Sequence, residues 1–232
     1  MANVELIKSD VSRAVLGALF AGLCIAGAAS AEGPPVTGGT VTMAIGGDPT
    51  SINPGLASNY SRQIIGCMIY QGLVRVSANS EIQPLLAKSW TISEDGKTYT
   101  FELVETQWHD GTPFTADDVV YSLTEVSKKL GPIFAQAGDK IETVEALASN
   151  RVEVTLKESF GPFLMSLACP QNGAIMPAHI FEGSDPLANE ASFTAPVGTG
   201  PFKLAEWERG SYLRLIRNDG YFEDGKPYLD EI

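Results

Sequence analysis

The chain has two histidines, and they are its first candidates for chemistry. His109 lies in the turn-like sequence Trp-His-Asp-Gly, and His179 lies in Pro-Ala-His-Ile at an expected helix start. A zinc or nickel site would need both imidazoles to converge with thiolates or carboxylates from distant segments, which a sequence does not show. Turn and capping roles are the simpler interpretation, so we expect no metal site.

The motifs that usually indicate catalysis are absent. The sequence contains no Gly-x-Ser-x-Gly, no P-loop, no His-Glu-x-x-His, and no Gly-x-Gly-x-x-Gly that opens a helix. The neighbouring carboxylates Asp117 and Asp118 could act as an acid/base pair, but carboxylates in the first turn of a helix also stabilise it. We therefore predict a protein that is not an enzyme and has no cofactor. A secreted hydrolase is the alternative from a different class.

Two further features could contact a small ligand. The backbone N–H groups of Gly198-Thr199-Gly200 could hold an anion, although a tight turn into the following strand explains this sequence equally well. Aromatic side chains could stack on a ligand, although strand aromatics more often fill a core. The aromatic candidates are Trp90, Trp108, Trp207, Tyr212 and Tyr221.

Composition and charge exclude several classes of protein. The 232 residues are 44% hydrophobic and 19% charged, which is typical of a folded globular chain. With 16 basic and 28 acidic residues the net charge is −12, which repels phosphate backbones and argues against a nucleic-acid partner. The 23 glycines and 14 prolines favour many tight connections and a sheet-containing fold over a helical bundle.

The N-terminus resembles a secretory signal peptide over residues 1–31. Lys8 and Arg13 precede an uncharged apolar stretch, and Ala29 and Ala31 flank Ser30 as in a signal-peptidase site. A retained membrane helix is the alternative. We expect cleavage and export to the periplasm of a Gram-negative cell. Cys67 and Cys169 would then remain, and two free buried thiols are favoured over one bridge between them.

Elements expected along the exported chain alternate between strands and helices. A strand at 40–45 leads into a turn-rich loop at 46–55, and a helix follows at 59–71. Thr115 and Asp118 form a capping box for a helix that runs to about 130. The remaining expectations are a strand at 73–76, a short helix at 162–168, and hairpins that pair 90–92 with 98–103, 141–147 with 151–156 and 202–207 with 212–217.

Periodicity identifies the buried faces of these elements. Tyr99, Phe101 and Leu103 alternate with polar residues and should face a core. The helix after Thr115 should bury a stripe made of Val119, Leu123, Val126 and Leu130. Interleaved strands and helices indicate a mixed α/β (α+β) fold. A strand-like start at 229–232 leads us to expect the N-terminal portion of a longer protein.

Three segments together resemble a known family. They are LAKSWTISEDGKTYTFEL at 86–103, QWHDGTPFTADDVVYSL at 107–123, and PVGTGPFKLAEW with the LRLIRNDGYFEDGKPYLDEI that follows it. In this order they are similar to the family 5 extracellular solute-binding proteins of ABC importers, which bind peptides, oligopeptides and nickel. Val104 stands where the family commonly has a basic residue, and family members are much longer than this sequence.

The resemblance implies a type II periplasmic-binding-protein-like clamshell with two lobes. Residues 32–232 would form the first lobe, with an inserted subdomain at about 73–167, and the sequence would stop before the second lobe. Such a monomer would capture a di- or oligopeptide and deliver it to inner-membrane permease subunits with their ATPase. A binder of nickel, a metal chelate or another small solute is the alternative within the family.

The resemblance also places residues at the ligand. The loop at 46–54 and the segment at 197–200 would face the cleft. The aspartate that holds a peptide's amino terminus in the family belongs to a part beyond this sequence. The predicted ligand contacts are Asp48, Thr50, Asn53, Asn59, Asn172, Gly198, Thr199 and Gly200.

Overall fold

The computed structural model describes residues 35–56, 59–126 and 132–232. All of them except Pro35 belong to the compact unit Val36–Ile232, and the predicted signal peptide lies outside the described residues. Within the described ranges, no helix combines the length and apolar character that a membrane span requires.

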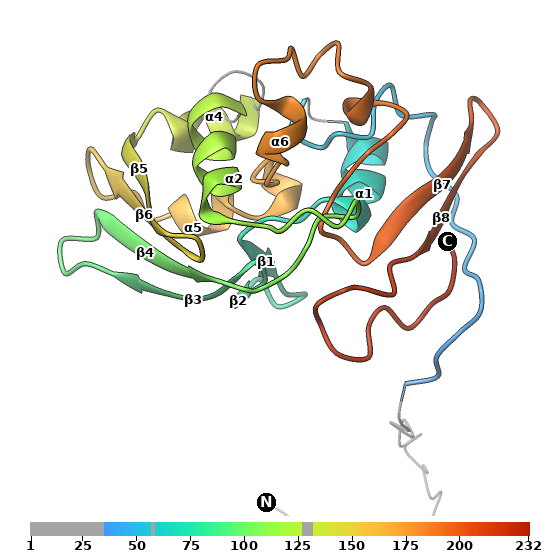
Figure 1. Ribbon diagram of the computed structural model, residues 1–232, viewed down its shortest axis with the longest axis horizontal. Helices are drawn as coiled ribbons and strands as arrows, with labels where there is room; N and C mark the ends of the chain where they lie inside the picture. The colour runs from blue at the N-terminus through green and yellow to red at the C-terminus, as the bar shows by residue number, and fades with distance from the viewer. Residues whose placement is uncertain (1–34, 57–58, 127–131) are drawn as a thin grey trace, which may run out of the picture. The chain divides into compact units, whose positions relative to one another are not determined.

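A four-stranded antiparallel sheet occupies one end of this unit (Figure 1). Its order is β3 (Ala87–Ile92), β4 (Thr98–Leu103), β6 (Arg151–Leu156) and β5 (Ile141–Ala148), which confirms two of the expected hairpins. Alternate side chains of β4 and β6 are buried against the helices, including Tyr99, Phe101 and Leu103 as predicted. A small hairpin of β1 (Val74–Val76) and β2 (Ile82–Pro84) adjoins it.

Helix α2 (Ala116–Tyr121) begins with the predicted capping box of Thr115 and Asp118. It does not continue as an α-helix to 130, because a π-helical segment, η1 (Ser122–Val126), follows it. The Ser122 hydroxyl donates to Asp118 O at 2.7 Å, a back-bond of the kind that bends helices. Val119, Leu123 and Val126 are buried as expected, and Leu130 lies outside the described residues.

The second part of the unit is built around α1 (Tyr60–Ile69). Asn59 caps this helix by accepting from Arg62 N at 3.1 Å, which confirms the predicted helix and its start. The third expected hairpin is formed by β7 (Phe202–Glu208) and β8 (Tyr212–Arg217), and it packs against α1. The remaining helical segments are α4 (Pro132–Gly138), α5 (Phe163–Ser166), η2 (Cys169–Gln171), α6 (Ala178–Phe181) and η3 (Glu190–Ser192).

Two clusters of buried apolar side chains form the core. One lies between the four-stranded sheet and α2, α4 and α5, and it draws on residues 73–175. The other surrounds α1 and includes side chains from α6 and both strands of the last hairpin. The presence of an inserted subdomain at about 73–167 remains a prediction, because two core clusters do not by themselves define a subdomain.

The expected strand at 40–45 forms only at its first residue. Thr40 bridges in parallel to Glu231, and Glu231 bridges in antiparallel fashion to Ile216 of β8. The segment at 230–232 therefore lies between β8 and Thr40, at the edge of the unit seen beside β8 in Figure 1. Residues 42–45 have the pattern of a strand, but none of them forms a β-bridge to another described residue.

The expectation of two free thiols is wrong, because Cys67 and Cys169 form a disulfide. Helix α1 presents Cys67 to the η2 turn, and the two Cα atoms lie 5.7 Å apart although 102 positions separate them in the sequence. This covalent bond joins α1 to the segment that follows α5.

We predict that replacing both cysteines, Cys67→Ser with Cys169→Ser, lowers the free energy of unfolding by about 2–5 kcal/mol. The disulfide closes a loop of 102 residues and so lowers the conformational entropy of the unfolded chain. Without it the unfolded state regains that entropy and becomes more favourable. Urea unfolding of the double variant and of the oxidised and reduced parent measures the effect. Equal midpoints for the oxidised and reduced parent would contradict it.

Candidate functional site

The loop at 46–54 is held by the tip of the last hairpin. The two carboxylate oxygens of Asp48 accept from Trp207 Nε1 at 2.9 Å and from Gly210 N at 3.1 Å. Arg209 donates to Pro49 O at 3.0 Å, and its guanidinium lies 3.3 Å from the centre of the Trp207 ring. The loop is therefore fixed at Asp48 and Pro49 by hydrogen bonds from the hairpin.

Helix α1 and Ser192 of η3 hold the rest of this loop. Thr50 Oγ1 accepts from the guanidinium of Arg62, a buried side chain whose pKa is lowered by burial. Asn53 is fully buried, where its amide donates to Ser192 Oγ at 3.1 Å and its oxygen accepts from Gly55 N at 2.9 Å. Both side chains of the loop thus stabilise its path over the start of α1.

Asn172 lies under the same loop, directly after η2. Its backbone is left-handed, with φ of 64°, and its side-chain amide donates to Pro54 O at 2.6 Å. Its Oδ1 atom is buried and makes no hydrogen bond to any described residue, and the same holds for Thr199 Oγ1. The disulfide at Cys169 fixes the turn that places Asn172 here.

The segment Gly198-Thr199-Gly200 packs against the C-terminal end of α1. Gly200 N donates to Ile69 O at 2.8 Å, which satisfies a carbonyl that the helix leaves open. A Cβ atom at Gly198 would lie 1.8 Å from Ile69 O, and one at Gly200 would lie 2.4 Å from Met68 O. Only glycine allows the two backbones to approach so closely.

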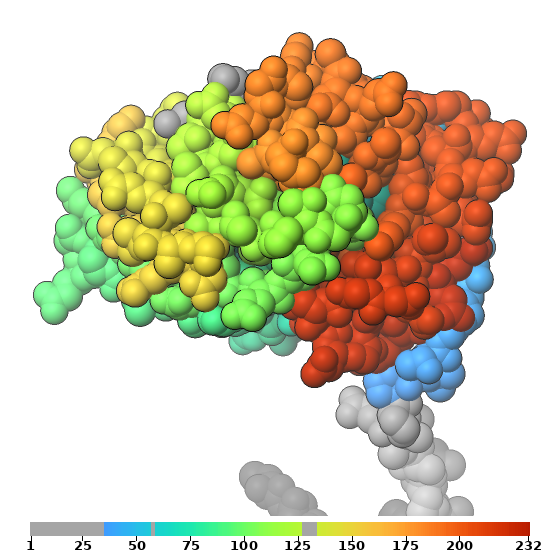
Figure 2. All heavy atoms as spheres, viewed as in Figure 1, coloured from blue at the N-terminus to red at the C-terminus, as the bar shows by residue number. Residues whose placement is uncertain are grey.

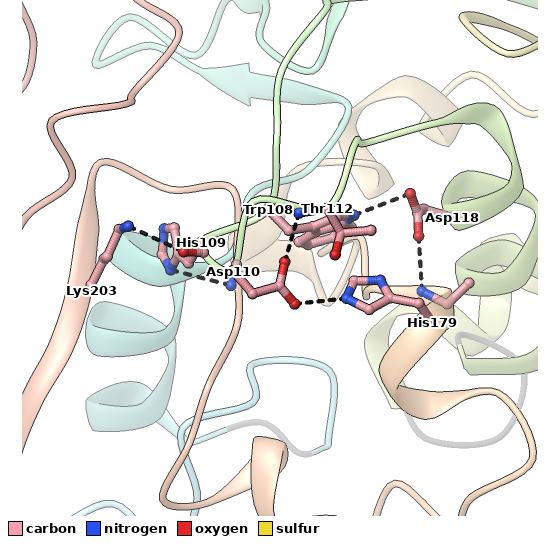
Figure 3. Close-up of polar contacts among 9 residues, drawn as sticks. Trp108, His109, Asp110, Thr112, Asp118, His179 and Lys203 are labelled. Atoms are coloured by element: carbon pink, nitrogen blue, oxygen red, sulfur yellow. Dashed lines mark hydrogen bonds and ion pairs between the residues drawn. The ribbon is translucent and has the colours of Figure 1, made fainter.

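His109 joins the Trp-His-Asp-Gly turn to this segment (Figure 3). His109 N donates to Gly198 O at 2.9 Å, Nδ1 accepts from Gly198 N at 3.3 Å, and Nε2 donates to Gly200 O at 2.9 Å. Lys203 donates to the carbonyl of His109 at 3.2 Å. Burial lowers the pKa of His109 to about 4, so the imidazole is neutral at pH 7 and binds as a proton donor and acceptor.

The same turn is tied to α2 and α6 by two aspartates (Figure 3). Asp110 contacts His179 Nε2 at 2.8 Å. Asp118 is buried and accepts from Trp108 Nε1 at 3.1 Å, Thr115 N at 2.9 Å and Ala178 N at 2.8 Å. These bonds stabilise the carboxylate and join the two core clusters, so both histidines have structural roles here.

The structure thus places the predicted residues near the two ends of α1. Asp48, Thr50 and Asn59 are exposed, whereas the other five are buried, namely Asn53, Asn172, Gly198, Thr199 and Gly200. Their contact with a ligand stays a prediction. Among the described residues, no three histidine, cysteine or acidic side chains group as metal ligands would.

A cavity of about 680 Å³ lies beside Asp48. Its size falls within the range of small-molecule pockets, about 300–1,000 Å³. Its walls come from the segment at 40–48, from α1, from β8 and from 231–232, and include Met43, Ile65, Met68 and Leu213. Of the eight predicted residues, Asp48 is the one that lines it.

Sequence reasoning missed the contacts that position the site. His109 and Gly198 are 89 positions apart, and Asp48 and Trp207 are 159 positions apart. The sequence shows both turns, at His109 and at Gly198, but no residue near either turn indicates that the two turns contact each other.

The fold is that of a type II periplasmic binding protein. Oligopeptide-binding AppA from Bacillus subtilis, solved with a nonapeptide, is 32% identical with a TM-score of 0.77, over 85% of this chain and 40% of that one. NikZ from Campylobacter jejuni, solved with Ni(L-His), is 28% identical with a TM-score of 0.70, over 85% and 39%. The predicted fold class is therefore confirmed.

Sequence comparison defines the family. The family described as "Bacterial extracellular solute-binding proteins, family 5 Middle" matches residues 81–232. Glutathione-binding protein GsiB of Escherichia coli (strain K12) is 33% identical over 194 residues, which are 83% of this chain and 37% of that protein. The chain belongs to the family 5 extracellular solute-binding proteins, and it spans less than half the length of these relatives.

We predict that Gly198→Ala lowers the free energy of unfolding by about 3 kcal/mol or more, because the new Cβ would overlap Ile69 O. Gly161→Ala is the matched control, since nothing lies within 4 Å of a Cβ there and its effect should stay within about 0.5–1 kcal/mol. Urea unfolding compares the two variants. Equal effects would contradict the close approach.

We predict that His109 makes stability fall between pH 7 and pH 5. Its pKa is about 4 when folded and about 6.5 in the unfolded chain, so the unfolded state binds more protons in this window. The contribution is complete above pH 6.5, and about 2 kcal/mol of it is lost at pH 5.

His109→Gln should flatten this part of the pH profile of the unfolding free energy, because glutamine does not titrate in this range. A profile that stays as steep in His109→Gln as in the parent would refute the assignment.

Proposed function

We propose that this protein captures peptides outside the cytoplasm for an ABC importer. The observation that carries the proposal is the likeness to AppA, a relative solved with a nonapeptide, at 32% identity and a TM-score of 0.77. The matched family is described as extracellular solute-binding proteins, and this sequence lacks the usual catalytic motifs. Peptide capture is thus an activity of binding and release.

The geometry supports a role for the loop at 46–54. Asp48 and Pro49 are fixed by the hairpin, which leaves Gly46 and Gly47 exposed on a loop with a defined path. A binding surface that is ordered before the ligand arrives loses less entropy on binding. In this proposal Asp48, Thr50 and Asn59 contact the ligand, and the five buried residues keep the loop and the segment at 197–200 in place.

Delivery of the captured solute would require permease subunits with their ATPase, and the protein would act as a monomer. The net charge of −12 keeps such a carrier away from anionic membrane surfaces until it docks. A cleavable signal peptide at 1–31 would export it to the periplasm.

Nickel or a metal chelate is the second candidate cargo, because NikZ was solved with Ni(L-His). The described residues offer no cluster of metal ligands, so such a cargo would have to bring its own chelator.

NMR titration of the ¹⁵N-labelled protein tests the proposal, because it detects millimolar affinities. The chain spans 37–40% of its relatives, so it would provide one wall of an enclosing site, and we expect binding weaker than micromolar. Mixed di- to nonapeptides should shift the amides of Gly46, Gly47 and Thr50. The variant Asp48→Asn removes the negative charge at this position and keeps the shape of the side chain. It should therefore lower the affinity for peptides by about tenfold or less.

If Ni(L-His) shifts these amides and peptides do not, the proposed cargo is a metal chelate and the peptide proposal is wrong. Turnover of an ester, peptide or glycoside would overturn the whole class. No shift with any of the solutes at 10 mM, a concentration of about ten times a millimolar dissociation constant, would refute solute capture by this surface.

A further inference from the structure

The end of the loop at 46–54 is held by two elements at Pro54. Asn172 Nδ2, directly after η2, donates to Pro54 O at 2.6 Å. From α1, Gln63 Nε2 donates to the same carbonyl at 3.4 Å, and a Cβ atom at Gly66 would lie 3.0 Å from Pro54 Cδ. Pro54 therefore lies between α1 and the η2 turn, and its position depends on the distance between these two elements.

The disulfide joins the same two elements. Cys67 follows Gly66 in α1, and Cys169 is the first residue of η2, the turn that ends at Asn172. The covalent bond and the hydrogen bond from Asn172 to Pro54 are thus two neighbouring ties between the η2 turn and the start of the chain's first helix.

Asn172 needs such a constraint, because its place has two local costs. Its backbone is left-handed, with φ of 64°, a conformation that is unfavourable for a residue with a Cβ atom. Its Oδ1 atom is buried without a hydrogen bond to any described residue, and a buried polar atom without a partner is costly. If the turn could move, water would bind Oδ1. The disulfide therefore keeps Asn172 under the loop.

Helix α1 has further contacts, so the η2 turn is the part that can move. Gly200 N donates to Ile69 O at 2.8 Å, and Tyr70 OH donates to Ala191 O at 2.9 Å. In Figure 2 the orange segment after about 175 and the light green segment cover most of the teal helix α1. Without the disulfide, we expect a displacement at 169–172 rather than in α1.

One cysteine of the disulfide can be reached from solvent. Cys67 is partly exposed, whereas Cys169 is 5% exposed. A thiolate of a dithiol attacks Cys67 Sγ, the S–S bond breaks, and its electron pair goes to Cys169 Sγ. The second thiolate of the dithiol then displaces Cys67 from the mixed disulfide. The two cysteines gain two electrons and two protons, and the dithiol becomes a disulfide.

We propose that the disulfide between Cys67 and Cys169 is a redox-sensitive lock on the loop at 46–54, which a dithiol opens. In the oxidised chain Asn172 holds Pro54, and in the reduced chain Asn172 moves away and the loop loses this contact. Solute affinity then falls, because a smaller fraction of the molecules has the loop in its binding conformation. This last step rests on the proposed function, and the lock itself does not.

NMR of the ¹⁵N-labelled full chain tests the lock without a ligand, because it observes the folded state directly. Millimolar dithiothreitol should release two thiols in addition to that of Cys24. It should also shift the amide signals of Ile52, Asn53 and Gly55, which now bond to Ser192 O and to the Asn53 side chain. The amides of β4 and β6 should keep their shifts.

Asn172→Gly is the matched variant. It keeps the disulfide and accepts the left-handed backbone, but it has no side chain to hold Pro54. Its loop amides should already resemble those of the reduced parent, and reduction should shift them by at most about one third as much as in the parent. Equal shifts on reduction in the parent and in Asn172→Gly would overturn the proposal, because the disulfide would then not act through Asn172.

The double variant Cys67→Ser with Cys169→Ser gives the open state independently of the reductant. Its loop amides should match those of the reduced parent. A disulfide that resists the dithiol in the folded protein would overturn the proposal. Unshifted loop amides in the reduced parent and the double variant would do the same. Unfolding of both would mean that the bond is only structural, which also contradicts a lock.

Peptide titration of the oxidised and reduced parent tests the last step. Peptides that bind the oxidised chain should bind the reduced chain about three- to tenfold more weakly. Equal affinities together with shifted loop amides would contradict the effect on the solute. If no peptide binds either form, the proposed function fails, and the loop amides still decide whether the lock exists.

Discussion

The close contact between the end of α1 and the segment at 198–200 is the constraint on which the site depends. A helix leaves its last carbonyls open, and here Gly200 N satisfies one of them at Ile69. The contact requires a backbone without a Cβ atom at Gly198, and α1 repeats the device at Gly66, where a Cβ would lie 2.5 Å from Ile52 O. The loop before α1 and the segment after residue 197 are therefore positioned by one helix.

Two polar side chains, His109 and Asp118, join the segments around this helix through hydrogen bonds. His109 is held neutral by burial, and it serves one backbone donor and two backbone acceptors of the segment at 198–200. Asp118 is buried, and its side chain accepts hydrogen bonds from three N–H groups. The free energy of unfolding therefore falls as the pH falls from 7 to 5, because His109 binds a proton more readily in the unfolded chain.

The fold and the family are those of the extracellular solute-binding proteins. The exposed surface at Gly46 and Gly47 lies on a loop whose anchors, Asp48 and Pro49, are bound by the hairpin at 207–210.

The sequence by itself determined the elements whose causes are local. Strand-like runs on either side of turn residues predicted the three hairpins, the helix expected from residue 59 is α1, and the capping box of Thr115 and Asp118 marked α2. Each of these depends on residues within a few positions. The quoted motifs also indicated the family. The tertiary structure alone decided which predicted site residues are buried, that Cys67 and Cys169 bond, and that the segment at 40–45 pairs only at Thr40. Each of these depends on contacts between residues about a hundred or more positions apart, and no local pattern in a single sequence encodes which distant backbone will lie alongside.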